Sequence, residues 1–197
     1  MRTSAPGQSP LLLLDVIDIL NKLKIPYAII GAFAASFHGV IRSSVDADAA
    51  ISLKKDKAVT EKLLSELKIS FEVTYRHGDS RDPIAFVINI EDRFHNRVDL
   101  LGGIKGMRDD AFTRTTHSTF MGSKIRISSI EDFVAMKIFA GGPQDIEDVR
   151  GVLRVSSKKL NVSLLKEISA QYGRDVVKKL EALLKESGQA GSVPVET

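Results

Sequence analysis

Hydrophobic residues recur with two different periods along the chain, and these periods predict its helices and strands. In residues 9–22 leucine and isoleucine recur every three or four positions behind a serine and a proline, which favour a helix N-cap and first turn. Residues 55–68 repeat this amphipathic pattern, and residues 32–38 predict a short helix before Gly39. Short apolar runs typical of strands lie at residues 26–30, 45–53, 70–75, 84–90, 96–101 and 124–128.

The chain after residue 128 carries only helical patterns. Ser128 and Glu131 have the spacing of a capping box at the start of one helix, and Pro143 favours the start of the next. Two further helical segments follow, near residues 163–172 and 174–186. We therefore expect a mixed αβ domain over residues 1–128, a helical region over residues 129–186 and a disordered tail over residues 187–197.

The composition is that of an ordinary soluble globular protein, with 43% hydrophobic and 27% charged residues. A net charge of +3 is too small to indicate nucleic-acid binding by itself. The absence of cysteine excludes disulfides, thiol nucleophiles and cysteine-ligated metal sites, and the four histidines lack ligand spacing. No apolar run has the length of a membrane span, so we expect a cytoplasmic protein with no membrane partner.

Three aspartates interrupt apolar runs that otherwise predict strands. Asp46 and Asp48 stand one residue apart, so in a strand they project from the same face, with their α-carbons roughly 6–7 Å apart. Asp99 is flanked in the same way, and a neighbouring strand could present it beside the pair. Neighbouring carboxylates repel each other, and apolar surroundings remove their hydration, so a cation is needed to compensate them. Three of them favour Mg²⁺ or Mn²⁺ and disfavour zinc.

A glycine follows the apolar run 26–30. Gly31 ends the expected strand and begins the short helix, which leaves backbone N–H groups where a phosphate could dock. Arg42, four residues before Asp46, could add a phosphate contact. A helix-packing role for Gly31 and a solvated loop position for Arg42 are the structural alternatives. Together with the acids, these residues favour a site for a nucleoside triphosphate.

This pattern resembles the nucleotidyltransferases related to DNA polymerase β. Their signature is a hydrophobic residue, Gly, and Gly or Ser, then about ten residues, Asp-hydrophobic-Asp/Glu, and a third acid on a later strand. Here it reads Ile-Gly-Ala at 30–32, Asp-Ala-Asp at 46–48 and Val-Asp-Leu at 98–100. The likeness covers roughly residues 25–155. It looks most like the small bacterial branch that includes abortive-infection-type toxins and antibiotic-modifying nucleotidyltransferases.

The resemblance implies an α/β (α+β) protein with a nucleotidyltransferase-fold mixed sheet, flanking helices and a C-terminal helical region. It implies transfer of a nucleoside monophosphate from a triphosphate to an acceptor hydroxyl, with Mg²⁺ or Mn²⁺ as cofactor. The implied catalytic and metal-binding residues are Asp46, Asp48 and Asp99. The implied phosphate-binding residues are Gly31, Ala32, Arg42, Ser44 and Lys137. Asp145 and Asp148 are possible supporting residues.

Several residues also have a second interpretation. Ala32 stands where the family prefers glycine or a small polar residue, so a hydroxyl contact to phosphate is lost and only the backbone N–H is left. A lysine placed like Lys137 most often extends to solvent, and acids in a first helical turn, such as Asp145 and Asp148, also favour the helix dipole.

Two other functions stay open at this point. One is a catalytically silent binding or regulatory module, such as an antitoxin-like partner or nucleotide sensor, which the alanine at position 32 favours. The other is a nucleotide-sugar glycosyltransferase, which can also use an Asp-x-Asp motif. The motifs do not select the acceptor among small molecules, RNA and protein, nor the preferred base.

Overall fold

The computed structural model describes residues 1–53 and 56–188 of the 197-residue chain. The chain divides into two compact units, the first made of residues 1–34 and 42–128 and the second of residues 35–41 and 129 onward. Most of the tail predicted over residues 187–197 lies outside the described residues. Among the described residues, none of the helices combines the length and the apolar character of a membrane span.

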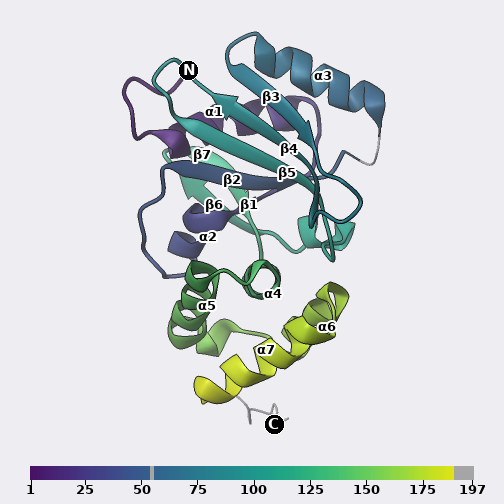
Figure 1. Ribbon diagram of the computed structural model, residues 1–197. Coiled ribbons are helices and arrows are strands. Elements are labelled where there is room, and N and C mark those ends of the chain that lie inside the picture. The colour runs from purple at the N-terminus through teal and green to yellow at the C-terminus, as the bar shows by residue number, and fades with distance from the viewer. Residues whose placement is uncertain (54–55, 189–197) are drawn as a thin grey trace. The chain divides into compact units, whose positions relative to one another are not determined.

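The first unit is built on one mixed sheet of seven strands (Figure 1). Its order is β3-β4-β5-β2-β1-β7-β6, with the β1–β7 and β2–β5 pairs parallel and the other pairs antiparallel. The strands are β1 (Tyr27–Ile30), β2 (Asp46–Ile51), β3 (Glu72–His77), β4 (Ile84–Glu91), β5 (Arg97–Ile104), β6 (Thr116–Phe120) and β7 (Ser123–Ile127). The predicted mixed αβ class is confirmed, and β4 and β5 form an antiparallel hairpin.

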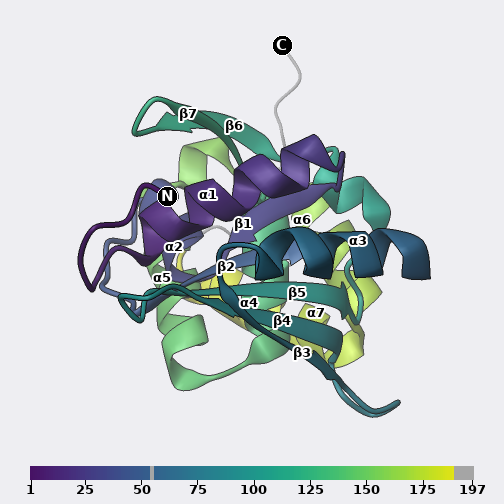
Figure 2. The same ribbon diagram turned by 90° about the horizontal axis from the view of Figure 1, so that it is seen from above.

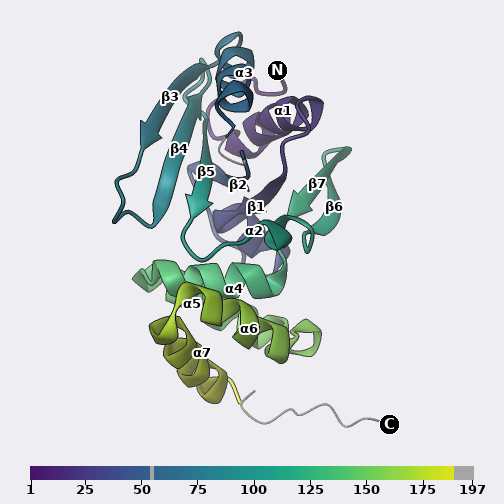
Figure 3. The same cartoon turned by 90° about the vertical axis from the view of Figure 1, so that its right-hand side faces the viewer.

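Helices α1 (Ser9–Lys22) and α3 (Lys57–Lys68) lie side by side over one face of this sheet (Figures 2 and 3). Lys22 Nζ lies 2.8 Å from a Glu66 carboxylate oxygen and joins the two helices. The strand residues of this face, among them Ala47, Ala49 and Leu100, are buried beneath them. Burial of the apolar face against amphipathic helices is the main stabilising contribution to this unit.

Two predicted helix caps are wrong by one position. The first helix begins at Ser9 itself, with Gln8 as N-cap, because the Ser9 hydroxyl donates to the Val45 carbonyl at 2.6 Å. Helix α4 (Ile130–Ala140) is capped by Ser129, whose hydroxyl accepts from the Asp132 N–H at 3.0 Å. At Ser9 a tertiary contact of the hydroxyl decides the cap, and the adjacent Ser128 and Ser129 leave the capping position of α4 open by one residue.

The second unit is helical. It contains α4, α5 (Pro143–Val155), α6 (Val162–Tyr172) and α7 (Arg174–Glu186), and the boundary between the units falls inside α2 (Gly31–Phe37). The core of the second unit includes Phe133 of α4, Val152 of α5 and Leu180 of α7, each at most 1% exposed. The helices predicted after residue 128 are confirmed, whereas strand β6 was not predicted.

A buried carboxylate fixes the turn between β4 and β5. Asp92 is 4% exposed and accepts hydrogen bonds from the backbone N–H groups of Phe94 (2.8 Å) and Asn96 (3.0 Å) and from Asn96 Nδ2 (2.9 Å). Asn96 in turn accepts from the Gln8 N–H at 2.6 Å, which ties the segment before α1 to this turn. Burial alone would raise the pKa of Asp92, but these hydrogen bonds to the ionised form outweigh it and lower the pKa.

We expect Asp92→Asn to reduce the free energy of unfolding at pH 7 by about 1–3 kcal/mol, because the buried turn loses charge-assisted acceptors. Since the folded pKa of Asp92 is below its ordinary value of 3.8, the stabilisation is complete above that value and is lost as the pH falls through the folded pKa. The difference from the unmodified chain should therefore shrink below pH 4 in urea titrations. A difference that stays constant down to pH 2 would contradict this role. The exposed control Glu72→Gln on β3 should leave the free energy of unfolding at pH 7 nearly unchanged.

Candidate active site

The three predicted acids lie on one face of the sheet, on two neighbouring parallel strands. In the register of β2 and β5, Asp48 is directly paired with Asp99, and Asp46 is two residues earlier on the same face. All three side chains are partly buried. The alternation along β2 places them opposite the face that α1 and α3 cover, because Ala47 and Ala49 between them are buried. The parallel pairing thus brings together acids that are about fifty positions apart in the sequence.

Asn89 is a site residue that the sequence reasoning missed. It pairs with Asp99 across β4 and β5, and its Nδ2 donates to Asp99 Oδ1 at 2.8 Å. This hydrogen bond fixes one carboxylate oxygen and leaves Oδ2 for another contact. The available signal was a single amide between the apolar Ile88 and Ile90 of a predicted strand. A polar side chain at such a position needs a partner, which here is the acid on the next strand.

Gly31 makes room for the Asp48 carboxylate. Its φ is +66°, and a Cβ atom built on it would lie 2.1 Å from Asp48 Oδ2 and 2.9 Å from Asp48 Cγ. Any other residue would therefore displace the carboxylate as well as strain the backbone. Gly31 is therefore needed at this position for a steric reason that differs from both of its predicted roles, phosphate binding and helix packing.

The other predicted phosphate-binding residues of the first unit lie around this point. Ala32 is the second residue of α2 and is 3% exposed. Arg42 and Ser44 lie in the segment between α2 and β2; Arg42 is partly buried and Ser44 is exposed. The structure therefore places the motif residues next to the strands that carry the acids.

Lys137, Asp145 and Asp148 form a charge cluster within the second unit. Lys137 Nζ lies 2.6 Å from Asp145 Oδ1 and 2.9 Å from Asp148 Oδ2. The Lys137 side chain is 9% exposed and that of Asp148 is fully buried, so the lysine does not extend to solvent as its type usually does. Asp145 also accepts from the Gly142 N–H at the start of α5, at 3.2 Å. The two acids thus compensate a buried ammonium group.

The donor set on the acid face fits a hard divalent cation in its chemistry. Asp46 Oδ1 and Asn89 Oδ1 are both buried and, within the described residues, have no hydrogen-bond partner. Buried acceptors without donors are uncommon, and an all-oxygen set is what Mg²⁺ or Mn²⁺ takes. As the side chains lie, however, no three acidic or histidine side chains of the described residues form a metal-binding cluster. Asp48 is turned to Gly31 and Asp99 to Asn89, so shared coordination requires these side chains to rotate.

Comparison with known proteins identifies the fold. No model of a protein family matches the chain, and no curated protein matches it. Among solved structures, ANT(2'')-Ia in complex with adenylyl-2''-tobramycin aligns with a TM-score of 0.54 and 16% identity over 82% of this chain and 94% of that one. The solution structure of ANT(2'')-Ia aligns with a TM-score of 0.55 and 14% identity over 93% and 98%.

A third structure gives the same result. The antigenic nucleotidyltransferase-like protein from Paracoccidioides brasiliensis aligns with a TM-score of 0.51 and 17% identity over 95% of both chains. At these identities the likeness concerns the fold. The chain has the nucleotidyltransferase fold that its motifs predict.

We expect Gly31→Ala to cost more stability than Gly122→Ala. Both glycines have positive φ, but a Cβ at Gly122 meets no atom within 4 Å. The backbone strain should therefore be similar, about 1–2 kcal/mol, and the clash with Asp48 should add roughly 1–3 kcal/mol. Chemical denaturation of each variant, with and without Asp48→Ala, measures this. Most of the excess cost should disappear in the Asp48→Ala background, where only the 3.1 Å contact with the Cβ of residue 48 is left. An undiminished excess there would show that Gly31 is required for another reason.

Proposed function

We propose that this chain is a metal-dependent nucleotidyltransferase, which moves a nucleoside monophosphate from a nucleoside triphosphate to an acceptor hydroxyl. The observation that carries the proposal is the pairing of Asp48 with Asp99 on a nucleotidyltransferase-fold sheet, with Asp46 on the same face and Gly31 against Asp48. The family resemblance implies that transfer uses this set of acids and a glycine at this turn.

Each acid has a proposed role that its position supports. Asp46, Asp48 and Asp99 would hold Mg²⁺ through carboxylate oxygens, and the unpartnered Asp46 Oδ1 supports this role. When bound, the metal supplies positive charge that offsets the phosphate oxygens. Asn89 holds Asp99 Oδ1, so Oδ2 would face the acceptor and accept its proton. Asn89 is thus a positioning residue for Asp99.

The proposed reaction is a single displacement at the α-phosphorus of the triphosphate. The acceptor hydroxyl loses its proton to Asp99 and its oxygen forms a bond to the α-phosphorus. The bond from that phosphorus to the bridging oxygen of the β-phosphate breaks, and pyrophosphate leaves. Backbone N–H groups of Gly31 and Ala32 and the side chains of Arg42 and Ser44 would contact the phosphates.

Lys137 is proposed as a nucleotide contact on the family resemblance alone. Its ammonium group is already within ion-pair distance of Asp145 and Asp148. Contact with a triphosphate would therefore require the phosphates to replace one of these carboxylates. Asp145, which is less buried than Asp148, is the partner that could be exchanged.

A nucleotide-binding module without transfer is the second candidate. It is favoured by the turned Asp48 and Asp99 carboxylates and by the buried alanine at position 32. The glycosyltransferase alternative accounts for neither the Gly31 contact nor the Asp99 pairing. Incubation with each labelled triphosphate, Mg²⁺ and a cell extract, followed by locating the label, separates an enzyme from a binding module. The labelled species identifies the acceptor as small molecule, RNA or protein.

We expect Mg²⁺ and a nucleoside triphosphate to bind together, because three carboxylates hold Mg²⁺ weakly until phosphate oxygens complete its octahedral coordination. In calorimetry, triphosphate affinity should fall at least about tenfold when Mg²⁺ is replaced by excess chelator, which corresponds to roughly 1.4 kcal/mol. Equal affinity in both buffers would exclude the metal-dependent site.

We expect Asp46→Asn and Asp48→Asn to abolish transfer without unfolding the chain. Removing one negative charge from a paired set relieves repulsion in the metal-free protein, so the melting temperature should be unchanged or higher. Thermal denaturation in chelator, beside a transfer assay in Mg²⁺, gives both readouts. The exposed Glu72→Gln on β3 is the control and should leave both unchanged. A marked fall in melting temperature for both aspartate variants would indicate structural carboxylates instead.

A further inference from the structure

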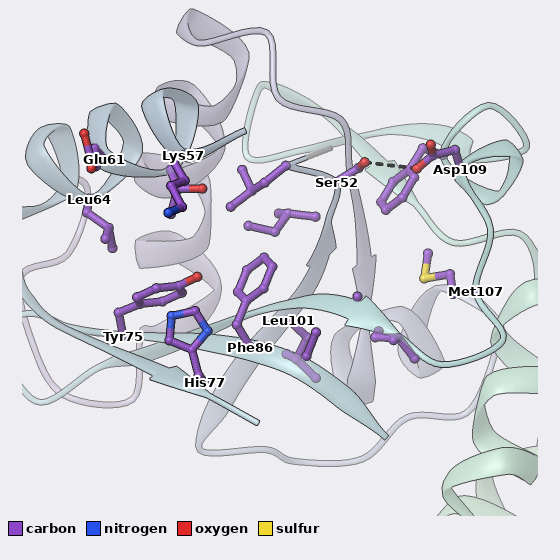
Figure 4. A pocket seen from close by; sticks show the side chains of 17 residues that line it. Ser52, Lys57, Glu61, Leu64, Tyr75, His77, Phe86, Leu101, Met107 and Asp109 are labelled. Atoms are coloured by element: carbon purple, nitrogen blue, oxygen red, sulfur yellow. Dashed lines mark hydrogen bonds between the residues drawn. The ribbon is translucent and has the colours of Figure 1, made fainter. Parts of the chain in front are cut away.

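A cavity of about 540 Å³ lies within the first unit, between α3 and the strands β2 to β5 (Figure 4). Its volume is in the range of small-molecule sites. Most of its lining is apolar and includes Ile51, Leu64, Phe86, Leu101, Met107 and Phe112. Nothing in the proposed transfer reaction uses this cavity.

Several strand residues that line the cavity are on the opposite face of the sheet from the three acids. Ile51 of β2 is three residues after Asp48, and odd spacing in a strand reverses the face. In the strand register, Ile51 pairs with Gly102, Gly102 with Phe86, and Phe86 with His77. These side chains therefore share the face that α3 covers. A ligand packed on these side chains would therefore lie across the sheet from Asp48, whereas Leu101 and Gly103 of the lining share the face of Asp99.

Two glycines of β5 let neighbouring side chains lie close to the sheet beside the cavity. A Cβ at Gly102 would lie 1.9–2.5 Å from ring atoms of Phe86, so the ring lies directly over the glycine. Gly103 has φ +64°, and a Cβ there would lie 2.6 Å from that of Ala85. Side chains at positions 102 and 103 would displace Phe86 and Ala85, so the glycines keep these two residues in place.

One wall of the cavity is aromatic. Tyr75 packs edge-on against Phe86, with ring centroids 5.6 Å apart, and against His77, with centroids 4.5 Å apart. A tyrosine hydroxyl is protonated at neutral pH and can donate a hydrogen bond, and burial raises the pKa of Tyr75 further. Such a wall favours a flat ring, which can pack against these edges and faces.

A cation faces this wall from α3. Figure 4 shows the Lys57 side chain directed from the helix toward the side of Tyr75. No hydrogen bond or ion pair joins Lys57 to another residue of the described chain. The acid at the other rim, Asp109, accepts a hydrogen bond from the Ser52 hydroxyl at 3.0 Å. The Lys57 ammonium group on α3 and the Tyr75 hydroxyl on β3 thus favour an anionic group at their end of the cavity.

We propose that this cavity binds a planar aromatic anion, with its ring packed along Tyr75 and Phe86 and its acidic group at Lys57. The site is independent of the proposed transferase activity, because it shares no residue with it. Glu61 also lines the cavity one turn after Lys57, so a dianion should bind less well than a monoanion.

Two matched fluorescent probes test this proposal on the full chain. One is 1-anilinonaphthalene-8-sulfonate, and the other is N-phenyl-1-naphthylamine, which has the same rings without the sulfonate. We expect saturable binding of the sulfonate at one site. Lys57→Gln should lower the affinity for the sulfonate about tenfold and leave the affinity for the neutral probe unchanged. The control Lys62→Gln, on α3 but outside the cavity lining, should change neither.

Filling the cavity tests the location. Leu64→Trp should weaken the binding of both probes. If this variant loses its far-UV circular dichroism signal or its melting transition, Thr60→Phe is used in its place. Sulfonate affinity that is equal in the unmodified chain and in Lys57→Gln would overturn the assignment of an anion. Binding of both probes that survives the filling variant would overturn the site.

Discussion

The close approach of the Asp48 carboxylate to Gly31 is the constraint on which the candidate active site depends. A carboxylate in the middle of a sheet has neighbours on both sides, and here one neighbouring strand carries a second acid, Asp99. The other side faces β1, where the chain turns into α2. The missing Cβ of Gly31 provides space there. Asp48 can thus remain partly buried without being forced against Asp99.

The same crowding explains how Asp99 is held. With Asp48 on one side, its carboxylate turns to the other strand and accepts from Asn89. The two paired acids are therefore held apart by a glycine and an amide. This divergence lowers repulsion in the metal-free chain, and it is also why no three-acid cluster is preformed among the described residues. A cation at this face would offset the remaining repulsion between the carboxylates, and the Asn89 hydrogen bond leaves Asp99 Oδ2 for that contact.

The sequence predicted the elements better than the contacts between them. Apolar periodicity located the helices and six strands, whereas β6 (Thr116–Phe120) was missed because four of its five residues are polar or small and it lies at the sheet edge. Family spacing predicted that Asp99 would lie beside Asp48, which periodicity alone cannot do. Asn89 and the reason for Gly31 depend on strand register, and register follows from the whole sheet.

One sheet thus has two faces of different chemistry, and alternation along β2 keeps Asp48 and Ile51 on separate faces. Acids at Asp48 and Asp99 need neighbours that accommodate charge, while Ile51 and Phe86 on the other face need apolar cover from α3. Glycines serve both faces for the same steric reason: Gly31 admits a carboxylate and Gly102 admits an aromatic ring. Because the two faces share strands but no side chains, a variant that fills the cavity should leave the acids in register. Loss of transfer in such a variant would then report coupling through the strands themselves, not occupation of the acid site.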